Sequence, residues 1–201
     1  MIRVVIAEDQ SMVRGALVAL LSLEQDIDVV GDVASGADVV ETVLRERPDV
    51  VLMDIEMPGM DGIAAAGAIR GHTPDCKVLI LTTFGRPGYL RGAMDAGAVG
   101  FLVKDAPASQ LADAIRRAMR GERVIDPELA MAALSSGPNP LTDRQREVLR
   151  LSLGGASISE MSKAMFLSEG TIRNYLSEAI SKLDARNRVD AARIAEERGW
   201  L

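Results

Sequence analysis

The amino-acid sequence predicts two domains, an α/β domain with a parallel sheet followed by a smaller all-α domain. The first half holds four short apolar runs rich in β-branched residues, a pattern typical of strands buried on both faces of a parallel sheet. A stretch rich in Ser, Gly, Pro and Asn, residues 135–140, then interrupts the pattern and is typical of a linker. From Leu141 onward, apolar residues recur at helical spacing and no further strand is expected.

The first two apolar runs, residues 2–7 and 49–53, lead directly into acidic side chains. Glu8 and Asp9 follow the first run, and Asp54 follows the second. Because ligands of open parallel sheets bind beyond the carboxyl ends of the strands, carboxylates at this edge would converge and repel one another. A hard divalent cation such as Mg²⁺, which takes oxygen ligands, would relieve that repulsion. The alternative, from these residues alone, is a set of separate carboxylates in solvated loops.

Residues 12–23 predict a helix that is apolar almost all round, with Arg14 and Ser22 as its only polar interruptions. A helix that covers one side of a sheet needs only an apolar stripe, so the outer face of this helix needs a second explanation. Either the chain's own second domain covers it, or it pairs with a second copy of the chain, which we favour because exposed apolar patches mark interaction sites. The residues predicted to form this dimer surface are Val13, Leu17, Val18 and Leu21.

The third and fourth apolar runs, residues 77–81 and 100–103, end in polar groups of another kind. Thr82 follows the third run and Lys104 follows the fourth, which adds a hydroxyl and an ammonium to the same edge of the sheet. A carboxylate, a metal pocket, a hydroxyl and a lysine are the parts needed to hold and stabilise a phosphoryl group. In such a site Asp54 would be the nucleophile and would form an acyl phosphate.

Residues 1–121 resemble the receiver domain of bacterial response regulators. The matching strings are Ala7-Glu8-Asp9, residues 53–62 (MDIEMPGMDG), Leu81-Thr82-Thr83 and residues 101–105 (FLVKD). The resemblance implies a flavodoxin-like fold with a parallel five-stranded sheet in the order 2-1-3-4-5. It also implies a sensor histidine kinase as the phosphoryl donor.

The same resemblance implies a role for each residue of the site. Asp54 is the expected phosphoacceptor, Lys104 the expected phosphate partner, and Thr82 and Phe101 the expected switch pair that reports phosphorylation, with the ring moving inward. The Mg²⁺ ligands that it implies are Glu8, Asp9, Asp54 and the main-chain carbonyl of Glu56. Two positions depart from the common pattern: Glu8 stands where many members have Asp, and Phe101 has no hydroxyl where many have Tyr.

Composition agrees with a regulator made of two globular domains. The chain has 201 residues, of which 48% are hydrophobic and 26% charged, as in ordinary globular proteins. It has no uncharged apolar run of about 18 residues and opens directly into a strand, so we expect no membrane insertion and a cytoplasmic location. The single cysteine, Cys76, cannot form an internal disulfide.

Charge is distributed unevenly along the chain. Residues 1–125 carry 13 Lys and Arg against 18 Asp and Glu, whereas residues 140–201 carry 10 against 9. Residues 140–201 therefore have only a small net positive charge, which is a weak sign of nucleic-acid binding, although basic residues cluster late in this part. They are Arg173, Lys182, Arg186, Arg188 and Arg193.

Residues 122–139 are assigned to a linker that contains a short helix, with Asp126 as its N-cap and Pro127 at its first position. Four helices are expected after it. The first opens with a capping pattern at residues 142–145, the second begins near Ser157, Ser168 caps the third, and the fourth covers residues 188–198.

Residues 140–201 resemble the helix-turn-helix domain of LuxR/NarL-type regulators. The matching strings are residues 141–149 (LTDRQREVL), 170–175 (GTIRNY) and 180–183 (ISKL). By this resemblance the side chains expected in the major groove are Arg173, Asn174 and Ser177, and those expected near phosphates are Thr171 and Lys182. Arg suits guanine and Asn suits adenine, so these residue types suit base reading. A closer similarity, to the DesR-like subgroup, rests on residues 82–89 and on Arg198-Gly199-Trp200.

The sequence therefore predicts a transcription regulator rather than an enzyme, beyond its own phosphotransfer and slow dephosphorylation. The expected partners are a sensor histidine kinase, double-stranded DNA, RNA polymerase and, on phosphorylation, a second copy of the chain. One alternative is a phosphatase or phosphotransferase that acts on small molecules through an aspartyl phosphate. Another is a receiver that works by protein contact without phosphorylation.

Overall fold

The computed structural model describes residues 1–83, 85–104, 108–135 and 137–201. Phe84 and Asp105, which belong to the matching strings, and Ser136 of the predicted linker lie outside these residues. The chain forms two compact units. One comprises Met1–Gly85 and Leu90–Met131, and the other Arg86–Tyr89 and Ala132–Leu201.

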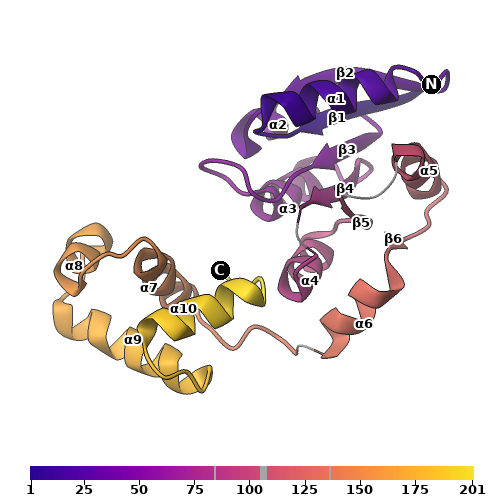
Figure 1. Cartoon of the computed structure of the whole chain (residues 1–201). Coiled ribbons are helices and arrows are strands. Elements are labelled where there is room, and N and C mark those ends of the chain that lie inside the picture. The colour runs from indigo at the N-terminus through magenta and orange to yellow at the C-terminus, as the bar shows by residue number, and fades with distance from the viewer. Residues whose placement is uncertain (84, 105–107, 136) are drawn as a thin grey trace. The chain divides into compact units, whose positions relative to one another are not determined.

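The first unit is built on a parallel sheet with the strand order β2-β1-β3-β4-β5-β6 (Figure 1). The strands are β1 (Ile2–Ala7), β2 (Ile27–Val33), β3 (Val50–Met53), β4 (Lys77–Thr82), β5 (Gly100–Val103) and β6 (Val124–Ile125). The predicted order of the first five strands is confirmed. The sixth strand corrects the sequence analysis, which placed residues 124 and 125 in the linker. It pairs with Gly100 and Phe101 of β5, and two residues are too few to show as an apolar run.

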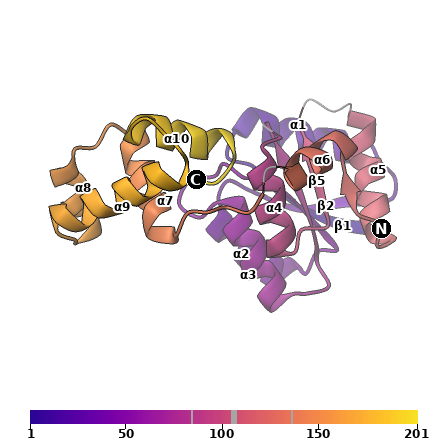
Figure 2. The same ribbon diagram turned by 90° about the horizontal axis from the view of Figure 1, so that it is seen from below.

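Helices cover both faces of this sheet. They are α1 (Ser11–Leu21), α2 (Gly36–Glu46), α3 (Gly62–His72), α4 (Pro87–Ala96) and α5 (Ala108–Met119). Helices α1 and α5 share one hydrophobic core with β1, β3 and β4, in which Leu21, Ile115 and Leu52 are almost completely buried. Helices α2 and α3 lie side by side (Figure 2). The sheet is thus buried on both faces, as its continuous apolar runs predict.

Helix α6 (Pro127–Ser135) begins after Asp126, whose carboxylate accepts a hydrogen bond from the backbone N–H of Leu129 at 3.1 Å. The short helix predicted there is confirmed. Within the described residues, no helix is long and apolar enough to cross a membrane.

The second unit contains the four helices predicted after the linker. They are α7 (Asp143–Leu153), α8 (Ile158–Met165), α9 (Glu169–Lys182) and α10 (Arg188–Glu197). Capping boxes start α7 at Thr142 and α8 at Ser157, and the side chain of Ser168 caps α9. One face of each helix packs into a common core that includes Leu149, Ile172 and Trp200, which follows α10. Residues Met165 to Glu169 make the tight turn between α8 and α9, and Phe166 adopts a left-handed conformation there with φ 55°.

Candidate phosphoacceptor pocket and recognition helix

The acidic side chains lie together at the carboxyl edge of the sheet. Backbone hydrogen bonds extend the strands to them, from the N–H of Asp54 to Ala7 (2.9 Å) and from the N–H of Glu8 to Val33 (3.0 Å). Glu8 and Asp54 are 1% and 4% exposed, whereas Asp9 is exposed. One carboxylate oxygen from each of Glu8, Asp9 and Asp54 lies within 4.8 Å of the others. The convergence expected from the strand ends is present.

Lys104 lies inside this cluster. Its Nζ is 2.6 Å from Oε2 of Glu8 and 3.0 Å from Oδ2 of Asp54, and its side chain is 13% exposed. The sequence predicted a phosphate partner near Asp54 but not the contact with Glu8. Glu8 has one more methylene than the Asp found at this position in many members, so its carboxylate reaches farther from β1. It is this carboxylate that lies 2.6 Å from the ammonium of Lys104.

These contacts shift the protonation equilibria of the pocket. Burial raises the pKa of Asp54, against the opposing effect of the hydrogen bond and charge of Lys104. Burial alone would lower the pKa of Lys104, but its hydrogen bonds to Glu8 and Asp54 outweigh that effect and the pKa of Lys104 is raised. The ammonium therefore stays charged and serves as the counter-ion of both carboxylates.

The loop after β3 is held against Asp54 by close backbone packing. The N–H of Ile55 donates to Oδ1 of Asp54 at 2.8 Å, which orients the carboxylate. The N–H of Gly62 donates to the carbonyl of Ile55, and a Cβ built on Gly62 would lie 2.0 Å from the carbonyl oxygen of Asp54. Gly62 is therefore a steric requirement of the site. Gly62 ends the string MDIEMPGMDG, and its steric role is visible only in the folded chain.

The two residues of the predicted switch are both buried. Thr82 is 1% exposed. Its carbonyl accepts a hydrogen bond from the N–H of Lys104 at 2.8 Å, so the end of β4 fixes the backbone of Lys104, which follows β5. Phe101 is 0% exposed. Its ring is already inside the domain in this structure. Glu56 lies in the loop between β3 and α3, and it is exposed.

The donor set suits a hard divalent cation. Carboxylate oxygens are the ligands that Mg²⁺ prefers, and Glu8, Asp9 and Asp54 each offer one within a common small volume. The ammonium of Lys104 lies 2.6 Å from Glu8, so a cation bound there would share that carboxylate with Lys104. The residues present fit the metal.

The predicted base-reading side chains lie on the open face of α9. Arg173, Asn174 and Ser177 are exposed, while Ile172 and Leu176 of the same helix are buried in the core. Arg173 pairs with Glu169 one turn earlier at 2.9 Å, and both side chains are largely in solvent. Thr171 is half-buried, and its hydroxyl lies 2.9 Å from that of Ser168 at the start of the helix.

Lys182, predicted near phosphates, contacts a buried amide instead of standing free. Its Nζ donates to Oε1 of Gln145 at 2.8 Å. The other end of the same amide, Nε2, donates to Glu178 at 2.8 Å, and Oε1 also accepts the N–H of Thr142 in the capping box of α7. Gln145 is 1% exposed. It joins the first turn of α7 to the last turns of α9, a link that the local capping pattern could not reveal.

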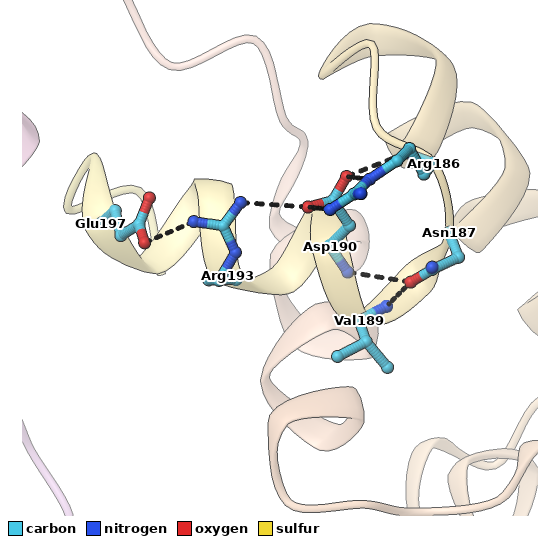
Figure 3. Close-up of polar contacts among 6 residues, drawn as sticks. All are labelled: Arg186, Asn187, Val189, Asp190, Arg193 and Glu197. Carbon is cyan, nitrogen blue, oxygen red and sulfur yellow. Dashed lines mark hydrogen bonds and ion pairs between the residues drawn. The ribbon is translucent and has the colours of Figure 1, made fainter.

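Several of the late basic residues are already neutralised. In Figure 3, Arg186 and Arg193 approach the carboxylate of Asp190 from two sides, and Arg193 also pairs with Glu197 at 2.6 Å. Hydrogen bonds from Arg186 hold the pKa of Asp190 well below its usual range. Asn187 caps α10 by accepting the N–H groups of Val189 and Asp190. The basic cluster of the sequence is thus partly a structural ion-pair network.

Helix α1 divides the predicted dimer residues between two environments. Leu17 and Leu21 are 9% and 2% exposed in the core, and Val13 and Val18 pack against that core from its edge. This corrects the placement of Leu17 and Leu21, whose side chains face the sheet and not the outer surface. The large apolar side chains that α1 and its end do expose are Met12 (86%), Leu20 (40%) and Leu23 (78%).

A phosphoacceptor-like pocket on a parallel α/β domain and a helix-turn-helix in the second unit define a receiver-type transcription regulator. Residues 4–116 match the family described as response regulator receiver domain, and residues 139–195 match bacterial regulatory proteins, luxR family. The chain belongs to the two-component response regulators that carry a luxR-type domain.

Individual relatives agree with this assignment. The chain is 48% identical to the transcriptional regulatory protein DesR of Bacillus subtilis (strain 168) over 201 residues, with 100% of both chains covered. The expected similarity to the DesR-like subgroup is confirmed. The crystal structure of response regulator ChrA of a heme-sensing two-component system is 35% identical, with a TM-score of 0.58 over 100% of this chain and 98% of that chain. The structure of an RcsB–DNA complex is 25% identical, with a TM-score of 0.65 over 98% of each chain.

Proposed function

We propose that phosphorylation of Asp54 by a sensor histidine kinase activates this transcription regulator. One observation carries the proposal: a carboxylate that is 4% exposed lies beside two further carboxylates and 3.0 Å from a lysine ammonium, at the ligand edge of a parallel sheet. Asp54 is the phosphoacceptor, Lys104 and Thr82 are the partners of the phosphoryl oxygens, and Phe101 is the switch residue.

The proposed transfer is a nucleophilic substitution at phosphorus. A carboxylate oxygen of Asp54 forms the new P–O bond while the P–N bond of a phosphohistidine breaks. The leaving imidazole nitrogen keeps the electron pair of the broken bond and takes up a proton. The hydrogen bond from Ile55 to Oδ1 leaves Oδ2 as the oxygen that faces Lys104, so we assign the attack to Oδ2.

Mg²⁺ is the proposed cofactor, held by Glu8, Asp9, Asp54 and the main-chain carbonyl of Glu56. When bound, it supplies positive charge that offsets the charge of the phosphoryl group. Lys104 supplies a second positive charge from the chain itself, and its raised pKa keeps that charge in place at neutral pH. Apart from its own phosphotransfer and slow dephosphorylation, we propose no enzymatic activity for the chain.

The proposed output is DNA binding by α9 in a homodimer. Arg173, Asn174 and Ser177 read bases, and Thr171 and Lys182 contact phosphates. The RcsB–DNA complex, which shares this fold at 25% identity, supports the DNA-bound state. The further proposed partner is RNA polymerase, and the proposed location is the cytoplasm.

Phosphoryl labelling tests the nucleophile. A small phosphodonor such as acetyl phosphate, with Mg²⁺, should label the wild-type chain and should not label Asp54→Asn, which keeps the fold but has no nucleophilic carboxylate. Asp28→Asn, an exposed aspartate on β2, is the matched control and should label normally. Undiminished labelling of Asp54→Asn would place the nucleophile elsewhere.

Light scattering tests the dimer surface. We expect phosphorylated wild-type protein to dimerise and phosphorylated Leu20→Asp to stay monomeric with Asp54 labelling intact, because Leu20 is exposed on α1 and its substitution leaves the core unchanged. Leu44→Asp, an exposed leucine on α2, is the control and should dimerise. The partly buried position Val18 is less suitable, because Asp there would also disturb packing against the core. A labelled Leu20→Asp protein that still dimerised would move the interface to another surface.

A further inference from the structure

A second hollow in the receiver unit lies at the edge of the sheet where the strands begin. It has a volume of ≈ 320 Å³, and its lining includes Lys77 at the start of β4, Val99 just before β5 and Arg123 just before β6. The phosphoacceptor pocket lies at the ends of the parallel strands, beyond Ala7, Met53 and Val103. The two sites therefore occupy opposite edges of the sheet.

Three cationic side chains line this hollow: Arg70, Lys77 and Arg123. None of them takes part in an ion pair with any described residue, whereas most arginines of the receiver unit are paired. The paired ones include Arg3, Arg14, Arg45, Arg116, Arg117 and Arg120. Unpaired positive charge is thus gathered at one concave place on this unit. A concave surface lined by cationic side chains focuses positive potential, so an anion there would be favoured.

The backbone holds one of these cations in position. Gly97 has φ +99°, and a Cβ built there would meet Cδ of Arg70 at 2.4 Å. The absence of that Cβ lets the stem of Arg70 lie across the glycine, and Nη1 of Arg70 donates to the carbonyl of Asp95 at 3.2 Å. The guanidinium is therefore placed at the rim of the hollow, with its remaining donors available.

The same hollow is lined by Cys76, the only cysteine of the chain. Burial, together with the nearby charge of Asp49, raises the pKa of this thiol to about 11, against the opposing effect of Lys77. The thiol is neutral at physiological pH and adds no negative charge to the hollow. It does provide a chemical reporter at the site itself.

We propose that this hollow binds a small polyphosphate anion. Its volume falls at the lower end of the range of small-molecule pockets, about 300–1,000 Å³. Guanidinium groups bind phosphate oxygens in a bidentate fashion, and a lysine ammonium adds a point charge. Arginines from α3 and from the start of β6, with the lysine that begins β4, surround the anion from three elements. The site goes beyond the proposed phosphorylation function and does not depend on it.

Alkylation of Cys76 tests the proposal in the full chain. The protein carries Asp54→Asn and the buffer contains EDTA, so that the phosphoacceptor pocket takes no part. The neutral reagent iodoacetamide is used at about pH 9, where a small fraction of the Cys76 thiol is present as the reactive thiolate. Inorganic pyrophosphate is the probe, and KCl of equal ionic strength is the control. At ten times its dissociation constant, pyrophosphate should slow alkylation by about tenfold.

Charge-neutralising variants identify the binding groups. Each of Arg70→Gln, Lys77→Gln and Arg123→Gln should weaken the protection by pyrophosphate about two- to fivefold, as expected for partly exposed ion pairs. Lys163→Gln removes an exposed charge from α8 and should leave protection unchanged. Arg70 and Arg123 are exposed, so their substitutions leave the core unchanged and keep the test usable if Lys77→Gln fails to fold. Equal alkylation rates with and without pyrophosphate, or full protection in all three variants, would overturn the proposal.

Parallel titrations separate the possible sources of the anion. Protection by pyrophosphate and by a nucleoside triphosphate, with little by inorganic phosphate, would assign the site to a phosphate chain as proposed. Equal protection by inorganic phosphate at the same concentrations would contradict the polyphosphate assignment, because a single phosphate would then suffice.

Discussion

The phosphoacceptor pocket and the open face of α9 both carry charged side chains, but the charges of the pocket are buried and those of α9 are in solvent. In the pocket, Glu8 and Asp54 are 1% and 4% exposed and share one ammonium, that of Lys104. On α9, Arg173 and Glu169 form an ion pair in which the side chains are 59% and 45% exposed. Removing one partner of a buried pair is costly, whereas an exposed pair contributes little to stability.

The pocket therefore holds buried charges that pair with one another, whereas α9 presents exposed charges that are accessible to a binding partner. In the proposed function the pocket responds to a single added phosphoryl group because Glu8, Asp54 and Lys104 are held together and largely shielded from water. In the proposed function Arg173 of α9 exchanges its partner Glu169 for a DNA group at small cost, because solvent already competes for both side chains. Substitutions should therefore act on stability in the pocket and on DNA affinity in α9.

The largest expected effect is that of Lys104→Met, which leaves two buried carboxylates without their counter-ion. In the absence of Mg²⁺ we expect the free energy of unfolding to fall by about 3–5 kcal/mol. Added Mg²⁺ should stabilise the variant more than the wild type, since the cation replaces the lost positive charge. Urea unfolding with and without Mg²⁺ measures both effects. A variant as stable as the wild type in EDTA would show that Lys104 is not needed to offset the repulsion between the carboxylates of Glu8 and Asp54.

The next effect concerns DNA and compares two cations of α9. Arg173→Ala should cost about 1–3 kcal/mol at a specific operator and relax preference at one base position. Lys182→Ala should weaken specific and non-specific binding alike and reduce the salt dependence, as for a phosphate contact. Salt-titrated binding assays distinguish the two. If both variants behaved alike, Arg173 would contact phosphate and would not read a base.

A smaller effect is the pH dependence contributed by Asp54. Its pKa is raised by burial, so its protonated form favours folding. This stabilising contribution is present below the unfolded pKa of about 3.9 and is lost as the pH rises through the raised pKa of the folded state. Asp54→Asn, which cannot ionise, should thus gain stability relative to the wild type between acidic and neutral pH in EDTA. A difference in unfolding midpoint that stays constant over that range would contradict the assignment.

The smallest expected effect is that of Glu169→Gln on α9. Because the pair with Arg173 is exposed, we expect a change in unfolding free energy of no more than about 0.5 kcal/mol. Operator affinity should stay equal or rise, because Arg173 no longer has an anionic competitor. Gel-shift titration and thermal unfolding measure the two quantities. A large loss of stability would mean that the exposed face of α9 is as charge-sensitive as the pocket.

Local sequence patterns were sufficient to predict the site residues where a strand ends in a chemically distinctive side chain. Glu8, Asp54, Thr82 and Lys104 each follow an apolar run, and the structure places the two carboxylates and the ammonium together. Strand β2 was less visible because Asp28, Gly31 and Asp32 interrupt it, and only the family resemblance implied it. Strand β6 was not predicted, because a strand of two residues is too short to show a periodic pattern.

Contacts between distant residues were beyond the sequence patterns. The apolar composition of residues 12–23 predicted a helix but could not separate Leu17 and Leu21, which face the core, from Leu20, which is exposed. The link from Gln145 to Lys182 spans 37 positions, and the hollow around Cys76 combines segments from Arg70 to Arg123. Such groupings depend on tertiary packing, which no local window reports.

The amide of Gln145 has a consequence for exchanging DNA specificity between regulators of this kind. Its oxygen accepts hydrogen bonds from both the N–H of Thr142 at the start of α7 and Lys182, and its nitrogen donates to Glu178, so one side chain adds a polar link between α9 and α7 to their shared apolar core. A chimera that received a foreign α9 without a matching acceptor and donor at positions 178 and 182 would leave this buried amide partly unsatisfied, at a cost of about 1–3 kcal/mol. The transplantable unit is therefore α9 together with the start of α7.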